Sequence, residues 1–263
     1  MTLRFLLFKL GDMFKKTSHN SHKSTEKDKY ERASLKLLEK GFDKTLSGHA
    51  KFKFCYQNPF IDYENIISSS LTREMKVLEI GAGTGNYTGQ IAKTGAKVIA
   101  SDISLNSLEV SKILNAEFDN IEFKIADIEK LPFESDEFDA ILSSGSLSYG
   151  EFIIVKQELL RVLKKGGLLI CVDALNDNPI YRLKRLIDVF RGKRTYMTYK
   201  NIPTIKSIEN LLENFEKSEI KFFGSATWVL SFFPNFSKIK YLSAFIDELV
   251  KCKKFGFLLL TCS

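Results

Sequence analysis

Residues 77–86 read Val-Leu-Glu-Ile-Gly-Ala-Gly-Thr-Gly-Asn, an apolar segment with one acid that runs into three glycines separated by single residues. The apolar part predicts a short buried strand. Glycines between a strand and a helix let a ligand approach the backbone closely, because no Cβ blocks it. A second apolar run, residues 98–102, ends in Asp102, where a carboxylate can accept both hydroxyls of a ribose. Together these features predict a nucleoside-containing cofactor at the C-terminal edge of a parallel sheet.

The spacing of the glycines distinguishes between nucleoside cofactors. Gly81, Gly83 and Gly85 follow G-x-G-x-G, whereas the dinucleotide fingerprint G-x-G-x-x-G would place its third glycine at Asn86. No Gly-Lys-Ser/Thr follows, so the loop also departs from a Walker A phosphate loop. The stretch instead resembles the first motif of class I S-adenosylmethionine (SAM) dependent methyltransferases, E/D-x-G-x-G-x-G.

The resemblance continues downstream in the same order as in that superfamily. Residues 127–133, Asp-Ile-Glu-Lys-Leu-Pro-Phe, resemble its adenine-binding segment and follow a predicted strand at 121–126. Residues 138–144 resemble the fourth strand, whose end faces the methyl group, and residues 157–172 resemble the helix, Gly-Gly turn and fifth strand that close the core. The ordered matches cover residues 74–173.

This resemblance implies a set of cofactor-binding residues. Glu79 would organise the ammonium end of SAM, Asp102 would hold the ribose, and Asp127 would accept a hydrogen bond from the adenine amino group while Ile128 covers the ring. The full expected set is Glu79, Gly81, Ala82, Gly83, Gly85, Asp102, Ile103, Asp127, Ile128, Ser143 and Ser144.

Alternating strands and helices predict the fold class, an α/β doubly wound (Rossmann-like) sheet with right-handed crossovers. The resemblance extends this to seven mostly parallel strands with an antiparallel last strand, a helical N-terminal lid and a helical insertion after strand five. We expect an N-terminal arm and flexible linker at 1–29, because residues 15–29 are polar and lack periodicity. The methyltransferase domain then spans 30–263, with its core at 74–175 and an acceptor-side region at 176–240. Further helices are expected from Pro179 and over 204–215 and 238–251, and further strands over 222–229 and 257–261.

Composition restricts the class of protein without naming its partner. The chain has 263 residues, a formal net charge of +7 and a hydrophobic content of 44%, which fit one α/β domain with additions. The positive charge favours anionic partners only weakly. The four cysteines form no C-x-x-C pair, so we expect reduced thiols, a cytoplasmic location and no metal site. Oligomeric state cannot be read from this sequence.

The N-terminal residues 3–10 are apolar but interrupted by Arg4 and Lys9. They are shorter than the ~20 apolar residues that a membrane-spanning helix needs. An interfacial helix with basic flanks is one interpretation, and a helix packed on the body of the domain is the simpler one. We therefore treat peripheral membrane contact as possible but do not favour it.

The acceptor is the least determined part of the function. Residues 178–185, 191–195 and 203–205 resemble a subgroup of small methyltransferases found with bacterial surface-polysaccharide biosynthesis, which implies O-methylation of a sugar or glycolipid precursor. One face of this predicted helix carries Ile180, Leu183, Ile187 and Phe190. The surrounding basic residues could pair with an anionic acceptor or form a solvated helix face. These basic residues are Arg182, Lys184, Arg185, Arg191, Lys193 and Arg194.

There are three alternatives to methylation of a glycan. Another small molecule, such as a quinone or secondary metabolite, is the first, and a non-catalytic SAM-binding scaffold is the second. Nucleic acid, the third, is not expected as a partner, since residues 143–146 read Ser-Ser-Gly-Ser and lack the Asn/Asp-Pro-Pro-Tyr motif of amino-group nucleic-acid methyltransferases.

An alcohol acceptor needs a group that removes its proton. Many relatives carry a His-His pair where this chain has Ser148-Tyr149, so a histidine base cannot be transferred there by resemblance. Tyr149 and His49 are the remaining catalytic candidates; the alternatives are a packed tyrosine and a solvated loop histidine.

Overall fold

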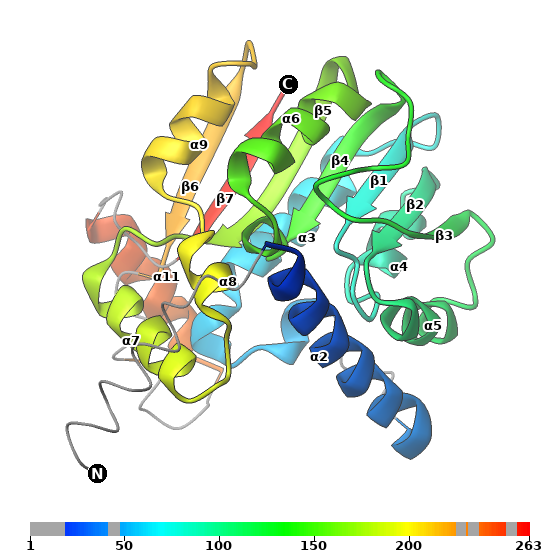
Figure 1. The fold of residues 1–263 in the computed structure, drawn as a ribbon. Coiled ribbons are helices and arrows are strands. Elements are labelled where there is room, and N and C mark those ends of the chain that lie inside the picture. Colours follow the sequence, from blue (N-terminus) through cyan, green and yellow to red (C-terminus); the bar gives the residue numbers. More distant parts are fainter. Residues whose placement is uncertain (1–18, 42–47, 225–229, 231–236, 251–256) are drawn as a thin grey trace.

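The computed structural model describes residues 19–41, 48–224, 230, 237–250 and 257–263 (Figure 1). Within them a seven-stranded sheet has the order β3-β2-β1-β4-β5-β7-β6. β7 is antiparallel to both β5 and β6, and the other pairings are parallel. This confirms the predicted fold class. The strands are β1 Lys76–Ile80, β2 Lys97–Asp102, β3 Ile121–Ile125, β4 Phe138–Ser144, β5 Leu163–Ala174, β6 Ser218–Phe223 and β7 Phe257–Cys262.

The central strands are buried on both faces, which is why they read as continuous apolar runs. On one face, Leu78 and Ile80 of β1 belong to a core cluster with Leu159 of α6 (Phe152–Val162) and Leu211 of α9 (Ile205–Leu212). On the other face, Val77 packs in a cluster that includes residues of α3 (Asn58–Ser70) and α4 (Thr88–Lys93). Two helical layers therefore enclose the sheet and leave the C-terminal ends of its strands as the place for a site.

Two strands begin four or more residues before their predicted starts. β5 begins at Leu163 rather than at residue 168, because Leu163 already pairs with Phe138 before the register shifts. The expected turn at 164–167 is thus the irregular start of this strand, with Gly166 in the left-handed region at φ 71°. β6 begins at Ser218, four residues before the predicted start, and the predicted strand's residues 225–229 lie outside the described residues.

The helices after β5 are fixed by their N-caps. Asn178 accepts hydrogen bonds from the backbone of α7 (Pro179–Phe190), with proline in the first turn as predicted. The short α8 spans Tyr196–Lys200. Thr204 and Ser207 form a reciprocal capping box at the start of α9. α11 spans Ile239–Val250, close to the predicted range.

The expected flexible linker is wrong where the structure describes it, because α2 spans His19–Lys40 as one continuous helix (Figure 1). Its inward positions are Lys23, Glu26, Tyr30 and Ser34, which follow helical spacing. Glu26 and Ser34 are buried although both are polar. A search for apolar periodicity misses such a helix, since the side that it buries is hydrophilic. Residues 1–18, which include the possible interfacial segment, lie outside the described residues.

Helix α2 is anchored on α5 (Leu105–Leu114) through a carboxylate. Glu31 Oε1 accepts a hydrogen bond from Leu105 N at 2.8 Å, and Glu31 Oε2 accepts one from Asn106 N at 3.0 Å. Ser34 Oγ lies 2.9 Å from Ser107 Oγ. A negative side chain at a helix N-terminus satisfies free backbone amides and complements the helix dipole, so Glu31 connects the two helices.

Replacing Glu31 by Ala should lower the free energy of unfolding by about 1 kcal/mol, because two amides of α5 lose their partner. Amide hydrogen exchange should also become faster along α2. Glu39→Ala, on an exposed position of the same helix, is the matched control. Equal exchange in the two variants would show that this carboxylate does not anchor α2.

Candidate functional site

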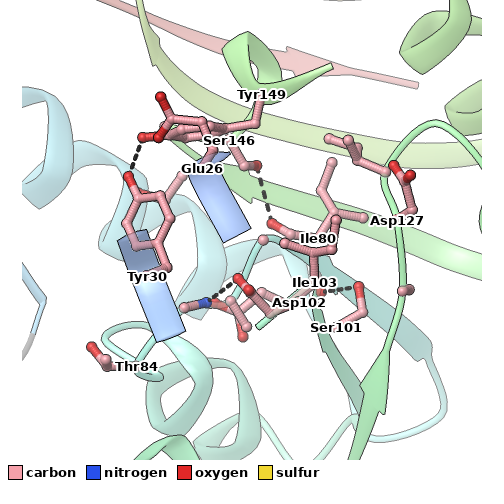
Figure 2. Close-up of a pocket in the computed structure, with 18 of the residues that line it drawn as sticks. Glu26, Tyr30, Ile80, Thr84, Ser101, Asp102, Ile103, Asp127, Ser146 and Tyr149 are labelled. Atoms are coloured by element: carbon pink, nitrogen blue, oxygen red, sulfur yellow. Dashed lines mark hydrogen bonds between the residues drawn. The ribbon is translucent and has the colours of Figure 1, made fainter. Parts of the chain in front are cut away.

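A pocket of about 310 Å³ lies between α2 and the C-terminal ends of β1, β2 and β4 (Figure 2). Ten of the thirteen residues predicted from sequence line it. The chain therefore brings together segments that are distant in sequence at the edge of the sheet where the strand order reverses. The predicted residues in the wall are Glu79, Gly81, Ala82, Gly83, Asp102, Ile103, Asp127, Ile128, Ser144 and Tyr149.

The glycine turn after β1 has different constraints at each position. Gly81 and Gly83 both have positive φ, at 61° and 55°. A Cβ on Gly81 would lie 2.4 Å from Ser146 Cβ, whereas one on Gly83 would meet nothing within 4 Å. Gly83 thus faces open space in the pocket. Gly85 does not line the pocket: its Cβ would lie 2.2 Å from Ser111 Oγ, so this glycine permits close packing against α5 instead.

Asp102, at the end of β2, fixes the glycine turn. Its Oδ2 accepts a hydrogen bond from Gly83 N at 2.8 Å, and its Oδ1 accepts one from Ser104 N at 2.8 Å. Burial raises the pKa of this carboxyl, and the two backbone hydrogen bonds act in the opposite direction. The residue predicted to hold a ribose therefore also holds the turn that borders the same space.

Glu79 is a buried acid in β1, only 3% exposed. Thr88 Oγ1 donates a 2.6 Å hydrogen bond to its Oε2. Burial raises the pKa of Glu79 to about 8, and the nearby charge of Asp102 adds to this. A cation placed beside Glu79 would reverse the effect, so the position suits an ammonium group.

At the opposite end of the pocket, Asp127 follows β3 and forms an ion pair with α2. Lys23 Nζ lies 2.6 Å from Asp127 Oδ2 and also contacts Glu129. Ile128 lines the pocket beside this pair. The lysine was missed because it lies in the segment predicted to be a linker.

The end of β4 contributes one predicted residue directly and one indirectly. Ser144 lines the pocket, but Ser143 does not. Ser143 Oγ lies 2.6 Å from Ser146 Oγ, which in turn donates to Ile80 O at 3.1 Å (Figure 2). Ser143 and Ser146 therefore tie β4 to β1 beneath the pocket, and Ser146, not Ser143, reaches its wall.

Tyr149 lies in the pocket wall and makes a hydroxyl–hydroxyl contact with Tyr30 of α2 (Figure 2). The two rings pack edge to face, with their centroids 5.5 Å apart. Burial and the neighbouring Tyr30 raise the pKa of Tyr149 far above its ordinary value. Tyr149 thus keeps its proton at neutral pH, which suits a hydrogen-bond donor and not a base.

His49 is not among the residues that line the pocket. Its Nδ1 lies 2.7 Å from Glu64 Oε2, and its backbone N donates to Glu64 Oε1 at 2.7 Å. These contacts fix His49 on α3, away from the space where a reaction would take place. The structure gives no support to a catalytic role for this histidine.

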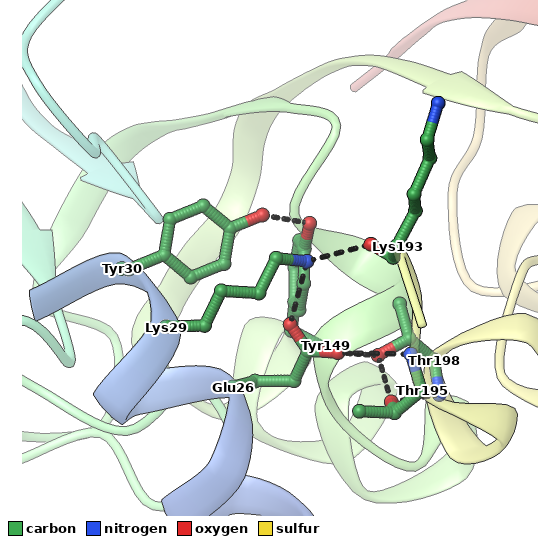
Figure 3. A network of polar contacts seen from close by, with 7 residues as sticks. All are labelled: Glu26, Lys29, Tyr30, Tyr149, Lys193, Thr195 and Thr198. Atoms are coloured by element: carbon green, nitrogen blue, oxygen red, sulfur yellow. Dashed lines mark hydrogen bonds and ion pairs between the residues drawn. The ribbon is translucent and has the colours of Figure 1, made fainter. Parts of the chain in front are cut away.

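A polar network connects α2 with the segment around α8 (Figure 3). Glu26 Oε1 accepts hydrogen bonds from Thr198 Oγ1 at 2.9 Å and from Thr195 N at 3.3 Å. Lys29 Nζ lies 3.5 Å from Glu26 Oε2 and donates to Lys193 O at 3.0 Å. Burial acts to raise the pKa of Glu26, but these hydrogen bonds and the Lys29 charge outweigh it and lower the pKa. Glu26 is therefore a charged group in the pocket wall.

The basic residues of α7 and of the segment after it differ in their exposure to solvent. Arg185 is buried and donates a hydrogen bond to Leu175 O, and burial lowers its pKa to about 10. It supports the segment after β5 and is not presented to an acceptor. Arg182, Lys184 and Lys193 remain exposed.

Two negative observations concern only the part of the chain that the structure describes. There, no group of three or more His, Cys, Asp and Glu side chains could hold a metal ion. None of the described helices combines the length and the hydropathy needed to cross a membrane.

Comparison with known protein families identifies the family of this chain. A family model described as "Methyltransferase domain" matches residues 71–219, more than half of the chain. The chain belongs to this methyltransferase domain family. The match contains the whole strand-end framework of the pocket, from Glu79 to Ser146, but excludes α2.

Curated relatives resemble part of this chain. A demethylmenaquinone methyltransferase of Clavibacter sepedonicus is 36% identical over 120 residues, covering 44% of this chain and 47% of the relative. One from Staphylococcus aureus (strain MRSA252) is 33% identical over 113 residues, 41% of this chain and 47% of the relative. The chain spans about half the length of the curated relatives it matches.

Solved structures share the fold of this chain. Geranyl diphosphate C-methyltransferase from Streptomyces coelicolor, in complex with Mg²⁺, geranyl diphosphate and S-adenosyl-L-homocysteine, has a TM-score of 0.57 and 15% identity over 79% of this chain and 80% of its own. A phosphoethanolamine N-methyltransferase from Haemonchus contortus, in complex with SAM, has a TM-score of 0.56 and 17% identity over 87% and 59% of the two chains. At this identity the likeness concerns the fold alone.

The raised pKa of Glu79 predicts that the free energy of unfolding falls as the pH rises. Between its ordinary value and about 8, the folded state binds a proton that the unfolded state releases, so stability falls as pH rises, by at most about 1.4 kcal/mol per pH unit. In the Glu79→Gln variant the melting temperature should decline less between about pH 6 and pH 8. Glu117→Gln, at an exposed position, should melt like the wild type throughout. If the melting temperatures of Glu79→Gln and the wild type changed with pH in parallel, Glu79 would not carry a proton in this pH range.

Proposed function

We propose that the protein binds SAM in this pocket and transfers its methyl group to a small-molecule acceptor. The observation that carries the proposal is the placement of three carboxylates, Glu79, Asp102 and Asp127, at the ends of adjacent strands around an open glycine turn. SAM presents an ammonium group, a ribose and an adenine, and each has a complementary acid in this order.

The glycine turn supports the same proposal. Gly83 has no neighbour within 4 Å in the direction of a Cβ, so the backbone is open to a ligand that packs against it. Glu79 would pair with the ammonium group, the Asp102 carboxylate would accept from the ribose hydroxyls, and Ile128 would cover the adenine. The remaining residues of the predicted set, Gly81, Ala82, Ile103 and Ser144, would supply the surrounding walls.

SAM supplies a methyl group already activated on a sulfonium centre, so positioning of the acceptor contributes much of the rate. Tyr30 and Tyr149 line the pocket, and Tyr149 keeps its proton; the pair can donate a hydrogen bond to an acceptor oxygen. Glu26 lines the same pocket as a carboxylate with a lowered pKa. We propose that Glu26, in place of His49 or Tyr149, accepts a hydrogen bond from an acceptor hydroxyl and orients its oxygen for methyl transfer.

The first acceptor candidate is a quinol-type aromatic ring. Tyr30, Phe52, Tyr87 and Tyr149 line the pocket and offer aromatic surfaces to a planar ring. The curated relatives named demethylmenaquinone methyltransferases agree with this candidate.

The second candidate is the hydroxyl of a sugar or glycolipid precursor, methylated on oxygen. It is favoured by the resemblance of residues 178–205 to methyltransferases of polysaccharide biosynthesis and by the exposed Arg182, Lys184 and Lys193. The buried thiols Cys55, Cys171 and Cys262 are unpaired, which agrees with a reducing, cytoplasmic location.

Calorimetric titration with S-adenosylhomocysteine tests cofactor binding, with NAD as the comparison ligand. The wild type should bind S-adenosylhomocysteine and not NAD. Asp102→Ala should weaken this binding by about tenfold to a hundredfold, because buried hydroxyls lose their acceptor. Asp119→Ala, at an exposed position, serves as the control. Wild-type affinity in a folded Asp102→Ala protein would refute the ribose assignment.

Transfer of a labelled methyl group from SAM to a panel of acceptors tests the reaction. A reduced demethylated quinone should be labelled in preference to lipid-linked sugars, and Glu26→Gln should lower kcat more than it raises KM. Labelling of the sugars alone would select the second candidate. Tight binding of S-adenosylhomocysteine with no transfer to any acceptor would instead indicate a SAM-binding scaffold.

A further inference from the structure

Helix α7 presents its apolar side to solvent. Ile180, Leu183 and Ile187 recur at helical spacing and are between 40% and 61% exposed. The opposite side, with Tyr181 and Arg185, is buried. An ordinary surface helix buries its apolar stripe, whereas these three apolar side chains of α7 are exposed.

Helix α11 has a similar stripe. Its exposed apolar residues are at least 47% exposed, while Ile239 and Ser243 face the protein. The spacing again places these side chains on one side of the helix. The exposed residues of α11 are Tyr241, Leu242, Phe245 and Leu249.

Gly224 links the two helices through hydrogen bonds. Tyr181 Oη of α7 donates a 2.9 Å hydrogen bond to Gly224 O, and Gly224 N donates a 2.9 Å hydrogen bond to Asp247 Oδ2 of α11. Figure 1 shows the helices at the same corner of the molecule. We refer to their exposed apolar residues as the α7/α11 surface, which comprises Ile180, Leu183, Ile187, Tyr241, Leu242, Phe245 and Leu249.

Cations border this surface. Exposed Lys184 lies next to Leu183 in α7, and exposed Arg191 comes directly after this helix. Exposed Lys238 comes directly before α11. The acids on the same helices are Asp188, which is half-buried, Asp247, which binds Gly224 N, and Glu248, which is exposed. An apolar stripe edged by lysine and arginine is the pattern of helices that lie in the interface of an anionic bilayer.

We propose that the α7/α11 surface docks on an anionic phospholipid bilayer. Single exposed apolar side chains are ordinary, but seven on two adjoining helices are not. The cationic border and the net charge of +7 supply complementarity to acidic headgroups. The proposal goes beyond methyl transfer and does not depend on it.

The segment after α7 connects this helix to the wall of the pocket. The segment that follows α7 contacts α2, since Lys29 donates to Lys193 O and Thr195 N donates to Glu26. Glu26 and Tyr30 of α2 line the pocket. A bilayer bound at α7 would therefore contact a helix that residues 193–195 link to this wall, which suits an acceptor that carries a lipid chain.

Cosedimentation of the full chain with vesicles tests the proposal. The protein should bind phosphatidylcholine vesicles that contain phosphatidylglycerol and bind pure phosphatidylcholine weakly. Leu183→Asp/Phe245→Asp should lower the partition coefficient on the order of a hundredfold, because two apolar anchors are lost. Lys184→Glu/Lys238→Glu should lower it about tenfold or more on acidic vesicles.

Matched controls are exposed residues of the same types on other elements, namely Ile125→Asp/Ile153→Asp and Lys93→Glu/Lys165→Glu. They should bind acidic vesicles like the wild type. Equal losses in control and test variants would overturn the proposal. So would a wild type that ignores acidic vesicles yet forms dimers, by light scattering, that Leu183→Asp/Phe245→Asp abolishes, since the surface would then pair two copies of the chain.

Titration with S-adenosylhomocysteine separates this proposal from the proposed function. A protein that binds S-adenosylhomocysteine but no vesicles would overturn membrane docking alone. A protein that binds acidic vesicles through the α7/α11 surface but no S-adenosylhomocysteine would leave docking supported and refute SAM binding.

Discussion

The Asp102 carboxylate is the constraint on which the site depends. It joins the end of β2 to the turn after β1 by accepting from Gly83 N, and it also orders the start of α5 by accepting from Ser104 N. Without an acceptor at this point, a glycine turn with positive φ at three positions would have many accessible conformations. One half-buried acid therefore sets the shape of the turn and, with it, the floor of the pocket.

Sequence reasoning succeeded where one pattern had one physical cause. Buried parallel strands show as apolar runs, and the acids at their C-terminal ends are visible in the sequence. Glu79, Asp102 and Asp127 were therefore expected at one site, and all three line the pocket; their contact with a cofactor stays a prediction. Gly85 and Ser143 match the same motifs but do not line the pocket. Gly85 packs closely against Ser111, and the Ser143 hydroxyl contacts that of Ser146. A motif identifies a segment, but side-chain direction depends on neighbours that the segment itself does not contain.

The missed residues have a common reason. Lys23, Glu26 and Tyr30 belong to a helix that buries polar groups, so no apolar periodicity marks it. Their partners, Asp127, Thr198 and Tyr149, lie more than one hundred residues away in sequence. The exposed apolar side of α7 was missed for the complementary reason, since helical spacing shows that Ile180, Leu183 and Ile187 share a face but not whether that face is covered.

The hydrophilic seam between α2 and the body of the protein has a kinetic consequence. Most contacts across it, such as those from Lys23 to Asp127 and from Glu26 to Thr198, join polar groups that water can also solvate. Separating such a seam exposes little apolar surface, so α2 can detach as a local unit while the sheet stays folded. Exchange of a ligand beneath it would then be limited by brief, stepwise hydration of this helix and not by the global unfolding rate.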